Sequence, residues 1–343
     1  MSKVGIGLVG FGAIARKHLA TMRGCDDVDI VGVFDPSAAA RAAAEKEGLR
    51  AFAGEDDFFA ARGLDGVILA TPNQLHADGA VACIERGLPV LIEKPVSDTV
   101  AGGERILAAQ RRRGTPVLVG HHRRHNPLIA KAREIVRSGR LGRVTAIVGL
   151  TLFLKPDEYF EIAWRREPGG GPVLINLIHD IDDLRFICGD IVAVEAMASS
   201  ARRGHAVEDT AAIVARFDNG ALATLIVSDA VPAPWSWELT SGENPVYPRQ
   251  HENCYLIAGT EGTLALPRLE LWRYGGARGW HSELSREVLA VTPEEPFQRQ
   301  LRHFIDVIRG RAEPLVTAED ALETLKVTLA IHDAARGRPV AIG

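Results

Sequence analysis

The 343-residue sequence lacks the features that mark membrane, secreted and repeat proteins. It has no apolar run approaching the roughly 18 to 20 residues that a membrane-spanning helix requires. The segment Met1–Val9 has no basic stretch followed by an apolar core and a small-residue cleavage site. Internal repeats and low-complexity linkers are also absent. We therefore expect a globular protein of the cytoplasm.

Cysteine and net charge are both scarce. The four cysteines are scattered without a Cys-x-x-Cys pair, which favours reduced core thiols over a disulfide framework or a zinc site. A formal net charge of −4 gives no electrostatic reason to bind nucleic acid or an anionic membrane. Basic clusters such as Arg111–Arg113 are typical of solvated faces. The expected ligands are therefore small molecules.

The length of the chain favours two domains, which we place at residues 1–122 and 123–343. In the first, short apolar runs alternate with helix-forming stretches, a pattern that predicts a doubly wound parallel sheet of the Rossmann type. The predicted strands are Gly5–Val9, Ile30–Phe34, Val67–Ala70, Val90–Ile92 and Val117–Val119; the predicted helices between them are Ala13–Arg23, Ser37–Glu47, Gln74–Arg86 and Thr99–Arg112.

After Gly120 the pattern changes to strands in succession. A helix at Pro127–Ser138 and a β-like run from Arg143 to Leu154 precede a glycine turn and a second helix, read from Pro172 to Ile187. Hairpin signals between the later segments predict a large, mostly antiparallel sheet in an α/β domain. The later predicted strands are Val192–Ala198, Thr210–Phe217, Ala221–Ser228, Cys254–Ala258, Thr263–Leu266 and Leu269–Arg273, and closing helices are predicted at Pro296–Arg309 and Ala318–Arg336.

A glycine-rich turn links the first strand to the first helix, and it reads Gly10-Phe11-Gly12-Ala13-Ile14-Ala15. Gly10 permits a tight turn, Gly12 allows a pyrophosphate to approach the backbone, and Ala15 keeps the helix close to the sheet. The free N–H groups at the start of the helix attract an anion. This stretch in this place predicts a dinucleotide site.

Asp35 ends the second predicted strand, where a carboxylate accepts hydrogen bonds from both ribose hydroxyls of a dinucleotide. A negative charge there repels a 2′-phosphate, and no arginine follows until Arg41, so NAD is predicted over NADP. The alternative is that Asp35 serves only as a turn or helix cap before Pro36 and Ser37.

Three further stretches resemble a known family. Thr71-Pro72-Asn73 with His76 follows the fourth strand, Glu93-Lys94-Pro95 follows the fifth, and Gly170-Gly171 precedes His179-Asp180-Ile181-Asp182. Together they resemble the glucose-fructose oxidoreductase, inositol dehydrogenase and rhizopine-catabolism family (Gfo/Idh/MocA). The resemblance implies a Rossmann domain, a second α/β domain whose open sheet mediates homodimer or homotetramer contacts, and reversible hydride transfer to a secondary alcohol of a sugar, polyol or related ring.

The resemblance also implies positions for individual residues. Its cofactor-contacting positions are Thr71, Pro72, Asn73, His76, Glu93, Lys94, Pro95, His122, Trp164 and Arg165. Its substrate positions include His122 and Arg123, at the crossing into the second domain. Two alternatives concern these stretches: a metal cluster at His121, His122 and His125, which spacing disfavours, and a buried tryptophan beside an exposed arginine at Trp164 and Arg165.

Alcohol oxidation requires a group that accepts the hydroxyl proton. Lys94 is the first candidate, because a cationic nicotinamide and partial desolvation lower a lysine pKa, although a structural salt bridge is the alternative. His179 is the second candidate, and a satisfied core histidine is its alternative. Asn176 and Asp182 lie three residues before and after it on nearly one helix face, and both are predicted to bind the substrate. The family's usual carboxylate, four residues before the histidine, is Ile175 here. Asn176 replaces it only in part, since an amide cannot accept the proton.

The remaining pocket wall is predicted around Trp235, where aromatic and polar residues alternate as they do in sugar-binding surfaces. The alternative is that these residues serve only ordinary loop packing. The leading function is an NAD-dependent sugar or polyol dehydrogenase or reductase. A glycosidase that uses bound NAD transiently and a catalytically silent NAD-binding regulator are the alternatives, the latter because of Ile175.

Overall fold

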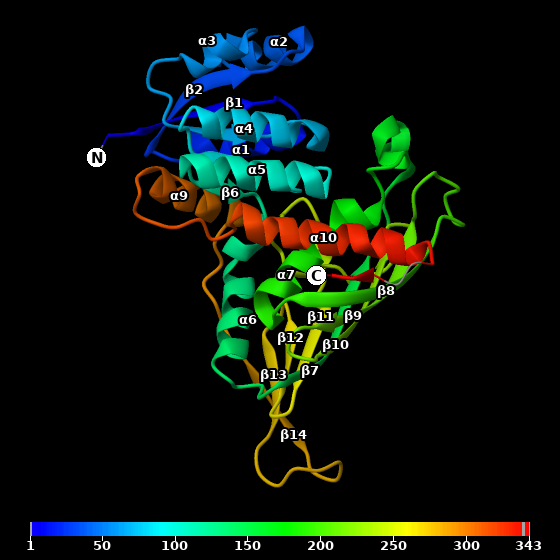
Figure 1. The fold of residues 1–343 in the computed structure, drawn as a ribbon. Coiled ribbons are helices and arrows are strands. Elements are labelled where there is room, and N and C mark those ends of the chain that lie inside the picture. Colours follow the sequence, from blue (N-terminus) through cyan, green and yellow to red (C-terminus); the bar gives the residue numbers. More distant parts are fainter. Residues whose placement is uncertain (1, 338–339, 343) are drawn as a thin grey trace. The chain divides into compact units, whose positions relative to one another are not determined.

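The computed structural model describes residues 2–337 and 340–342 and divides the chain into two compact units (Figure 1). Unit 1 comprises Met1–His125 and Glu294–Leu325, and unit 2 comprises Asn126–Pro293 and Lys326–Gly343. Residues 294–325, which the sequence analysis assigned to the second domain, therefore belong to unit 1. The reason is packing: helix α9 (Pro296–Ile308) contacts α1 and buries Leu301 and Phe304.

Unit 1 is built on a six-stranded parallel sheet in the order β3-β2-β1-β4-β5-β6. This is the predicted doubly wound sheet, and the strand order changes direction at β1 and β4. Its strands are β1 (Val4–Val9), β2 (Val28–Phe34), β3 (Ala51–Phe52), β4 (Gly66–Leu69), β5 (Val90–Ile92) and β6 (Val117–Val119). Almost every residue of β1, β4, β5 and β6 is buried, as expected for strands covered on both faces.

Helices connect the strands of unit 1, and several start at capping side chains. Ser37 accepts a hydrogen bond from the Ala40 N–H, and Thr99 accepts one from the Gly102 N–H. The helices are α1 (Ala13–Arg23), α2 (Ala38–Lys46), α3 (Glu55–Phe59), α4 (His76–Glu85) and α5 (Val100–Arg113), with short 3₁₀ segments η1 (Asn73–Leu75) and η2 (His122–His125).

Unit 2 contains a nine-stranded sheet in the order β14-β13-β12-β11-β7-β10-β9-β8-β15. Only the β7–β10 pair is parallel among the pairings described, so the predicted antiparallel character is confirmed. The strands are β7 (Val144–Leu152), β8 (Ile191–Ser199), β9 (Thr210–Phe217), β10 (Leu222–Ser228), β11 (Tyr255–Gly259), β12 (Thr263–Leu266), β13 (Glu270–Tyr274), β14 (Leu284–Val288) and β15 (Val340–Ala341).

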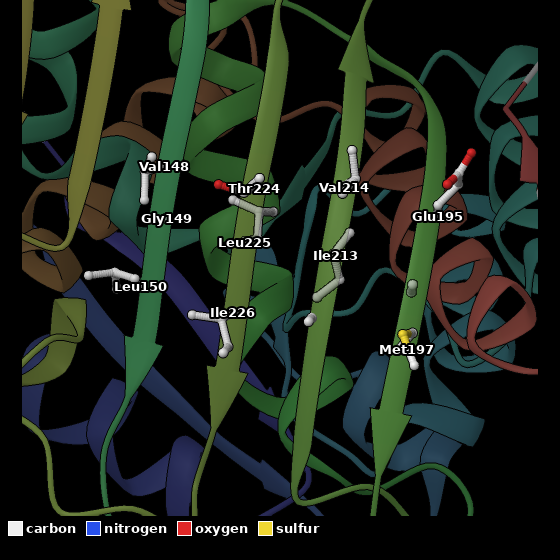
Figure 2. Close-up of a pocket in the computed structure, with 12 residues that line it drawn as sticks. Val148, Gly149, Leu150, Glu195, Met197, Ile213, Val214, Thr224, Leu225 and Ile226 are labelled. Carbon is white, nitrogen blue, oxygen red and sulfur yellow. The ribbon is translucent and has the colours of Figure 1, made fainter.

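One face of this sheet is covered by helices, and the other is open within the described part of the chain. The covering helices are α6 (Pro127–Arg137), α7 (Ile178–Cys188) and the later turns of α10 (Ala318–Ala335), whose apolar side chains share a core with the sheet. Along β9 the alternation is strict: Ile213 is buried on the helix-covered face, whereas Val214 is 49% exposed. Figure 2 shows side chains of β7, β10, β9 and β8 on the open face. They line a pocket of about 450 Å³.

Candidate active site

The glycine turn has the backbone geometry that the sequence predicts. Gly10 has a φ of 88°, and a Cβ there would lie 2.7 Å from the Ala70 carbonyl oxygen, so only glycine fits. Gly12 is the N-cap of α1 and supplies no side-chain cap to the free N–H groups. A Cβ on Gly12 would meet no atom within 4 Å. Open space therefore lies in front of the helix N-terminus, as a pyrophosphate requires.

Asp35 connects the end of β2 to the glycine turn. Its Oδ2 accepts a hydrogen bond from the Phe11 N–H at 2.9 Å, and its Oδ1 accepts one from the Ser37 N–H at 2.8 Å. Each carboxylate oxygen keeps a second lone pair for a ribose hydroxyl. The guanidinium of Arg41 lies closer to Asp35 than their separation in the sequence suggests. Its Nη1 donates hydrogen bonds to the carbonyl oxygens of Asp35 and Pro36.

His76 joins the loops that follow β4 and β5. Its Nδ1 lies 2.7 Å from the Pro95 carbonyl oxygen and its Nε2 lies 2.9 Å from that of Thr71. Burial lowers the pKa of His76, against the opposing effect of these two carbonyl groups. The resemblance placed His76 along the cofactor. Its ring is buried between the two loops, and Asn73 begins the short η1 segment just before it. The cofactor contact of His76 stays a prediction.

Glu93 forms a buried pair with a residue that the sequence did not single out. Its Oε1 lies 2.6 Å from Nε2 of His18 on α1, and its Oε2 accepts a hydrogen bond from the Lys94 N–H at 3.2 Å. Burial raises the pKa of Glu93, but the hydrogen bond from His18 and the charges of His122 and Lys94 bring it below its ordinary value. The carboxylate beside Lys94 therefore stays ionised.

The residues at the end of unit 1's first segment are mostly buried. His122 stacks on Phe297 of α9 at 4.5 Å between ring centroids, whereas Arg123 is 4% exposed. Arg124 forms an ion pair with Asp320. Among the described residues, no group of three or more His, Cys, Asp or Glu side chains is placed to hold a metal ion.

In unit 2, Trp164 and Arg165 lie in a 3₁₀ segment, η4 (Ala163–Arg166). Trp164 is 50% exposed, so the alternative of a buried tryptophan is wrong. Arg165 stacks over the Tyr159 ring at 3.9 Å and donates from Nη1 to the Tyr159 carbonyl oxygen. The tryptophan face is therefore accessible, while the arginine is held against its neighbour.

The predicted helix around His179 begins with a π-helical turn, Val173–Leu177. The Ile178 N–H bonds to the Val173 carbonyl oxygen five residues earlier, and Asn176 lies inside this turn. α7 follows without a break. His179 is 8% exposed and Asp182 is 1% exposed, so Asp182 is directed into the unit's interior.

Asn176 contacts a polar cluster in which sequence reasoning missed Lys155 and Asp229. Its Oδ1 accepts a hydrogen bond from Lys155 Nζ at 2.7 Å, and its Nδ2 lies 3.5 Å from Glu238 Oε1. Lys155 also forms an ion pair with Asp229 at 3.2 Å. Trp235, the predicted wall residue, is 39% exposed and accepts the Leu152 N–H through its carbonyl oxygen.

The fold and this site define an oxidoreductase with an NAD-binding Rossmann domain. The chain belongs to the Gfo/Idh/MocA family: residues 4–121 match the family model described as "Oxidoreductase family, NAD-binding Rossmann fold", and residues 129–265 match "GFO/IDH/MocA C-terminal domain". It is an enzyme of the dehydrogenase and reductase type. No helix in the described part of the chain has the length and apolarity to cross a membrane.

Similar proteins include several sugar-active enzymes. The chain is 28% identical to the 1,5-anhydro-D-fructose reductase of Ensifer adhaerens, covering 96% of this chain and 95% of that one. It is also 28% identical to the D-apiose dehydrogenase of Paraburkholderia graminis, covering 97% and 88%. Among solved structures, the WlbA dehydrogenase of Bordetella pertussis, in complex with NADH and UDP-GlcNAcA, superposes with a TM-score of 0.82 at 25% identity and covers 99% of both chains.

Proposed function

We propose that the protein transfers a hydride between NAD and a secondary alcohol or ketone carbon of a sugar, polyol, inositol or related cyclic substrate. The observation that carries this proposal is the glycine turn tied to Asp35, with its open helix N-terminus. The names of the two relatives, which reduce an anhydrofructose and oxidise apiose, support the substrate class.

The residues of unit 1 fit the cofactor. Backbone groups of Gly10-Phe11-Gly12-Ala13-Ile14 would hold the pyrophosphate, and Asp35 the adenine ribose. The loops of Thr71-Pro72-Asn73 and Glu93-Lys94-Pro95, joined by His76, would lie along the rest of the dinucleotide. NAD supplies the hydride acceptor or donor. We keep NAD as the preferred form over NADP.

Proton transfer falls to side chains of this chain. We assign the main acid–base role to Lys94, beside the ionised Glu93, and a second such role to His179. Asn176 would orient the substrate, with Trp235, Arg123 and His122 as further contacts. The alternative of a silent NAD-binding regulator, raised by the apolar Ile175 at the family's carboxylate position, is not supported, because the similar proteins are dehydrogenases and reductases.

We also propose a homo-oligomer that buries the open face of unit 2. Met197 is 79% exposed and Val214 is 49% exposed beside Val148 and Ile226 in Figure 2. An apolar sheet face of this kind favours a symmetric partner of the same sequence.

A substrate screen tests the enzymatic proposal. Sugars, polyols, inositols and cyclic hydroxy acids are offered with NAD, and their keto forms with NADH, while the absorbance of NADH is followed. We expect turnover of at least one compound. No turnover across the whole panel would contradict the proposed substrate class, and cleavage of a glycoside without net NADH change would favour the glycosidase.

A further inference from the structure

We propose that Lys155 is a positioning residue that fixes the side-chain amide of Asn176, so that Asn176 offers N–H groups to an acceptor oxygen of an uncharged substrate. The inference rests on the proposed function and deepens it. It states that Asn176 presents hydrogen-bond donors, rather than an acceptor, next to the position where the family's carboxylate is missing.

The contact between Lys155 and Asn176 decides the orientation of the amide. An ammonium group has three donors and no acceptor, so the atom 2.7 Å from Lys155 Nζ must be the amide oxygen. The –NH₂ group of Asn176 then faces the opposite way. Without the lysine, the two ends of the amide would be nearly equivalent in shape and free to exchange.

Lys155 is itself held in place. Its side chain is 8% exposed, and its Nζ pairs with Asp229 Oδ2, while Arg203 Nε occupies the other oxygen of that carboxylate at 3.2 Å. The ammonium also lies over the Tyr159 ring at 4.7 Å. Burial lowers the pKa of Lys155, and Asp229 and Glu238 oppose this shift while Arg203 adds to it. The lysine is thus confined by partners on several sides.

The –NH₂ group of Asn176 retains capacity for a ligand. Within the described residues its one acceptor is Glu238 Oε1, and the 3.5 Å separation is long for a hydrogen bond. Asn176 is partly exposed, and the π-helical turn displaces it from regular α-helical register. At least one N–H group is therefore available to a carbonyl, ether or hydroxyl oxygen.

The cations of the cluster are all matched by carboxylates. Lys155 and Arg203 face the carboxylates of Asp229, Glu238 and Asp157, so this wall presents hydrogen-bonding groups without a surplus of positive charge. Such a wall favours a neutral polyhydroxy or keto compound over a phosphorylated or carboxylated one. An N–H donor at this position also binds the oxidised, carbonyl form of a substrate better than a carboxylate, which only accepts hydrogen bonds, would.

The test is Lys155→Met, which keeps the length of the side chain and removes the donor. Lys131→Met is the matched control, because Lys131 belongs to the same unit and its one ion pair among the described residues is with Glu134 of the same helix, α6. In NADH-loaded protein without substrate, the side-chain amide resonances of Asn176, assigned by their loss in Asn176→Asp, should shift or broaden in Lys155→Met and not in Lys131→Met.

Kinetics provide the second measurement. With the ketone identified by the screen, Lys155→Met should raise KM about tenfold, the usual effect of one lost hydrogen bond, with NADH affinity unchanged. Asn176→Asp keeps the contact with Lys155 but removes the N–H donor, so it should raise KM for the ketone by a similar factor. Lys155→Arg keeps a cationic donor beside Asn176, so its KM should stay close to that of the wild-type protein. A carboxylated or phosphorylated substrate should turn over poorly.

The outcomes separate the two proposals. Unchanged amide resonances in Lys155→Met, or an Asn176→Asp variant with normal KM, would overturn the positioning role while leaving the dehydrogenase intact. If the screen finds no substrate, the resonance measurement still decides the positioning role. If Lys155→Met does not fold, the comparison of Lys155→Arg with Asn176→Asp decides the same question.

Discussion

Asp35 and Arg41 together set the response of the nucleotide site to a 2′-phosphate. The wild-type protein should bind NAD more tightly than NADP, because the Asp35 carboxylate repels the additional phosphate. Asp35→Ser should narrow or invert that preference, and the nearby Arg41 guanidinium supplies a cation for the phosphate. Calorimetry with both cofactors measures this, and tighter binding of NADP to the unmodified protein would contradict it. Asp35→Ser combined with Arg41→Gln should lose the gain in NADP affinity.

Lys94 is the residue whose loss should affect chemistry most selectively. Lys94→Ala should lower kcat by about 10² to 10⁴, the usual contribution of a general acid or base, and leave NADH affinity nearly intact. Lys3→Ala, at an exposed pair with Asp29, is the control. His179→Ala should lower kcat and raise KM, while Asn176→Ala should mainly raise KM. Near-normal turnover of Lys94→Ala with the true substrate would remove Lys94 from this role.

The contact between α1 and the end of β5 should show itself in the pH dependence of stability. The folded-state pKa of Glu93 lies below its ordinary value. The His18–Glu93 pair therefore stabilises the protein above about pH 4, and this contribution is lost as the pH falls through the folded-state pKa of Glu93. His18→Leu leaves the carboxylate buried without its donor and should cost about 1 to 3 kcal/mol at neutral pH.

In His18→Leu, the contribution of Glu93 to the pH dependence of stability should have the opposite sign. With the donor gone, burial dominates and the pKa of Glu93 rises, so protonation at lower pH should relieve part of the destabilisation. Urea unfolding at pH 7.5 and pH 5 measures the change, with the conservative His18→Gln and the neighbouring Thr21→Val as controls. A pH-independent loss in His18→Leu, equal to that of Thr21→Val, would mean that His18 contributes packing alone.

The elements were predictable from the sequence where a repeating pattern exists. The buried strands of unit 1 and the alternating strand β9 were found, whereas β3 is only two residues long and β14 is exposed along its whole length, so neither carries a hydrophobic signal. The π-helical turn was missed because one extra residue per turn leaves no mark in a short apolar run.

The site was predictable only where local sequence determines it. The glycine turn and Asp35 follow from spacing along one strand–turn–helix unit. His18 and Lys155 depend on partners 75 and 21 residues away, which only the tertiary fold brings into contact. Arg41 was discounted because its distance along the chain hid the bend that returns its guanidinium to the end of β2.

The open face of unit 2 predicts the behaviour of the whole molecule in solution. Light scattering at micromolar concentration should give the mass of a dimer or tetramer. Met197→Glu with Val214→Glu should shift that mass toward the monomer, because charges would be buried in the contact. Val246→Glu, an equally apolar exposed position off the sheet, should leave it unchanged. A monomeric wild-type protein would rule the oligomer out.

The return of residues 294–325 to unit 1 has a consequence for synthesis on the ribosome. The Val119 N–H on β6 bonds to the Val316 carbonyl oxygen, and a Cβ on Gly66 would meet Ile308 at 2.5 Å. The first segment of unit 1, although translated early, thus waits for residues 294–325 to emerge before its packing is complete. Most of unit 2 is made in the interval. Unit 2 in turn needs Lys326–Gly343, because Val327 and Ile331 belong to its core, so neither unit should acquire full protease resistance in a nascent chain before these residues have emerged.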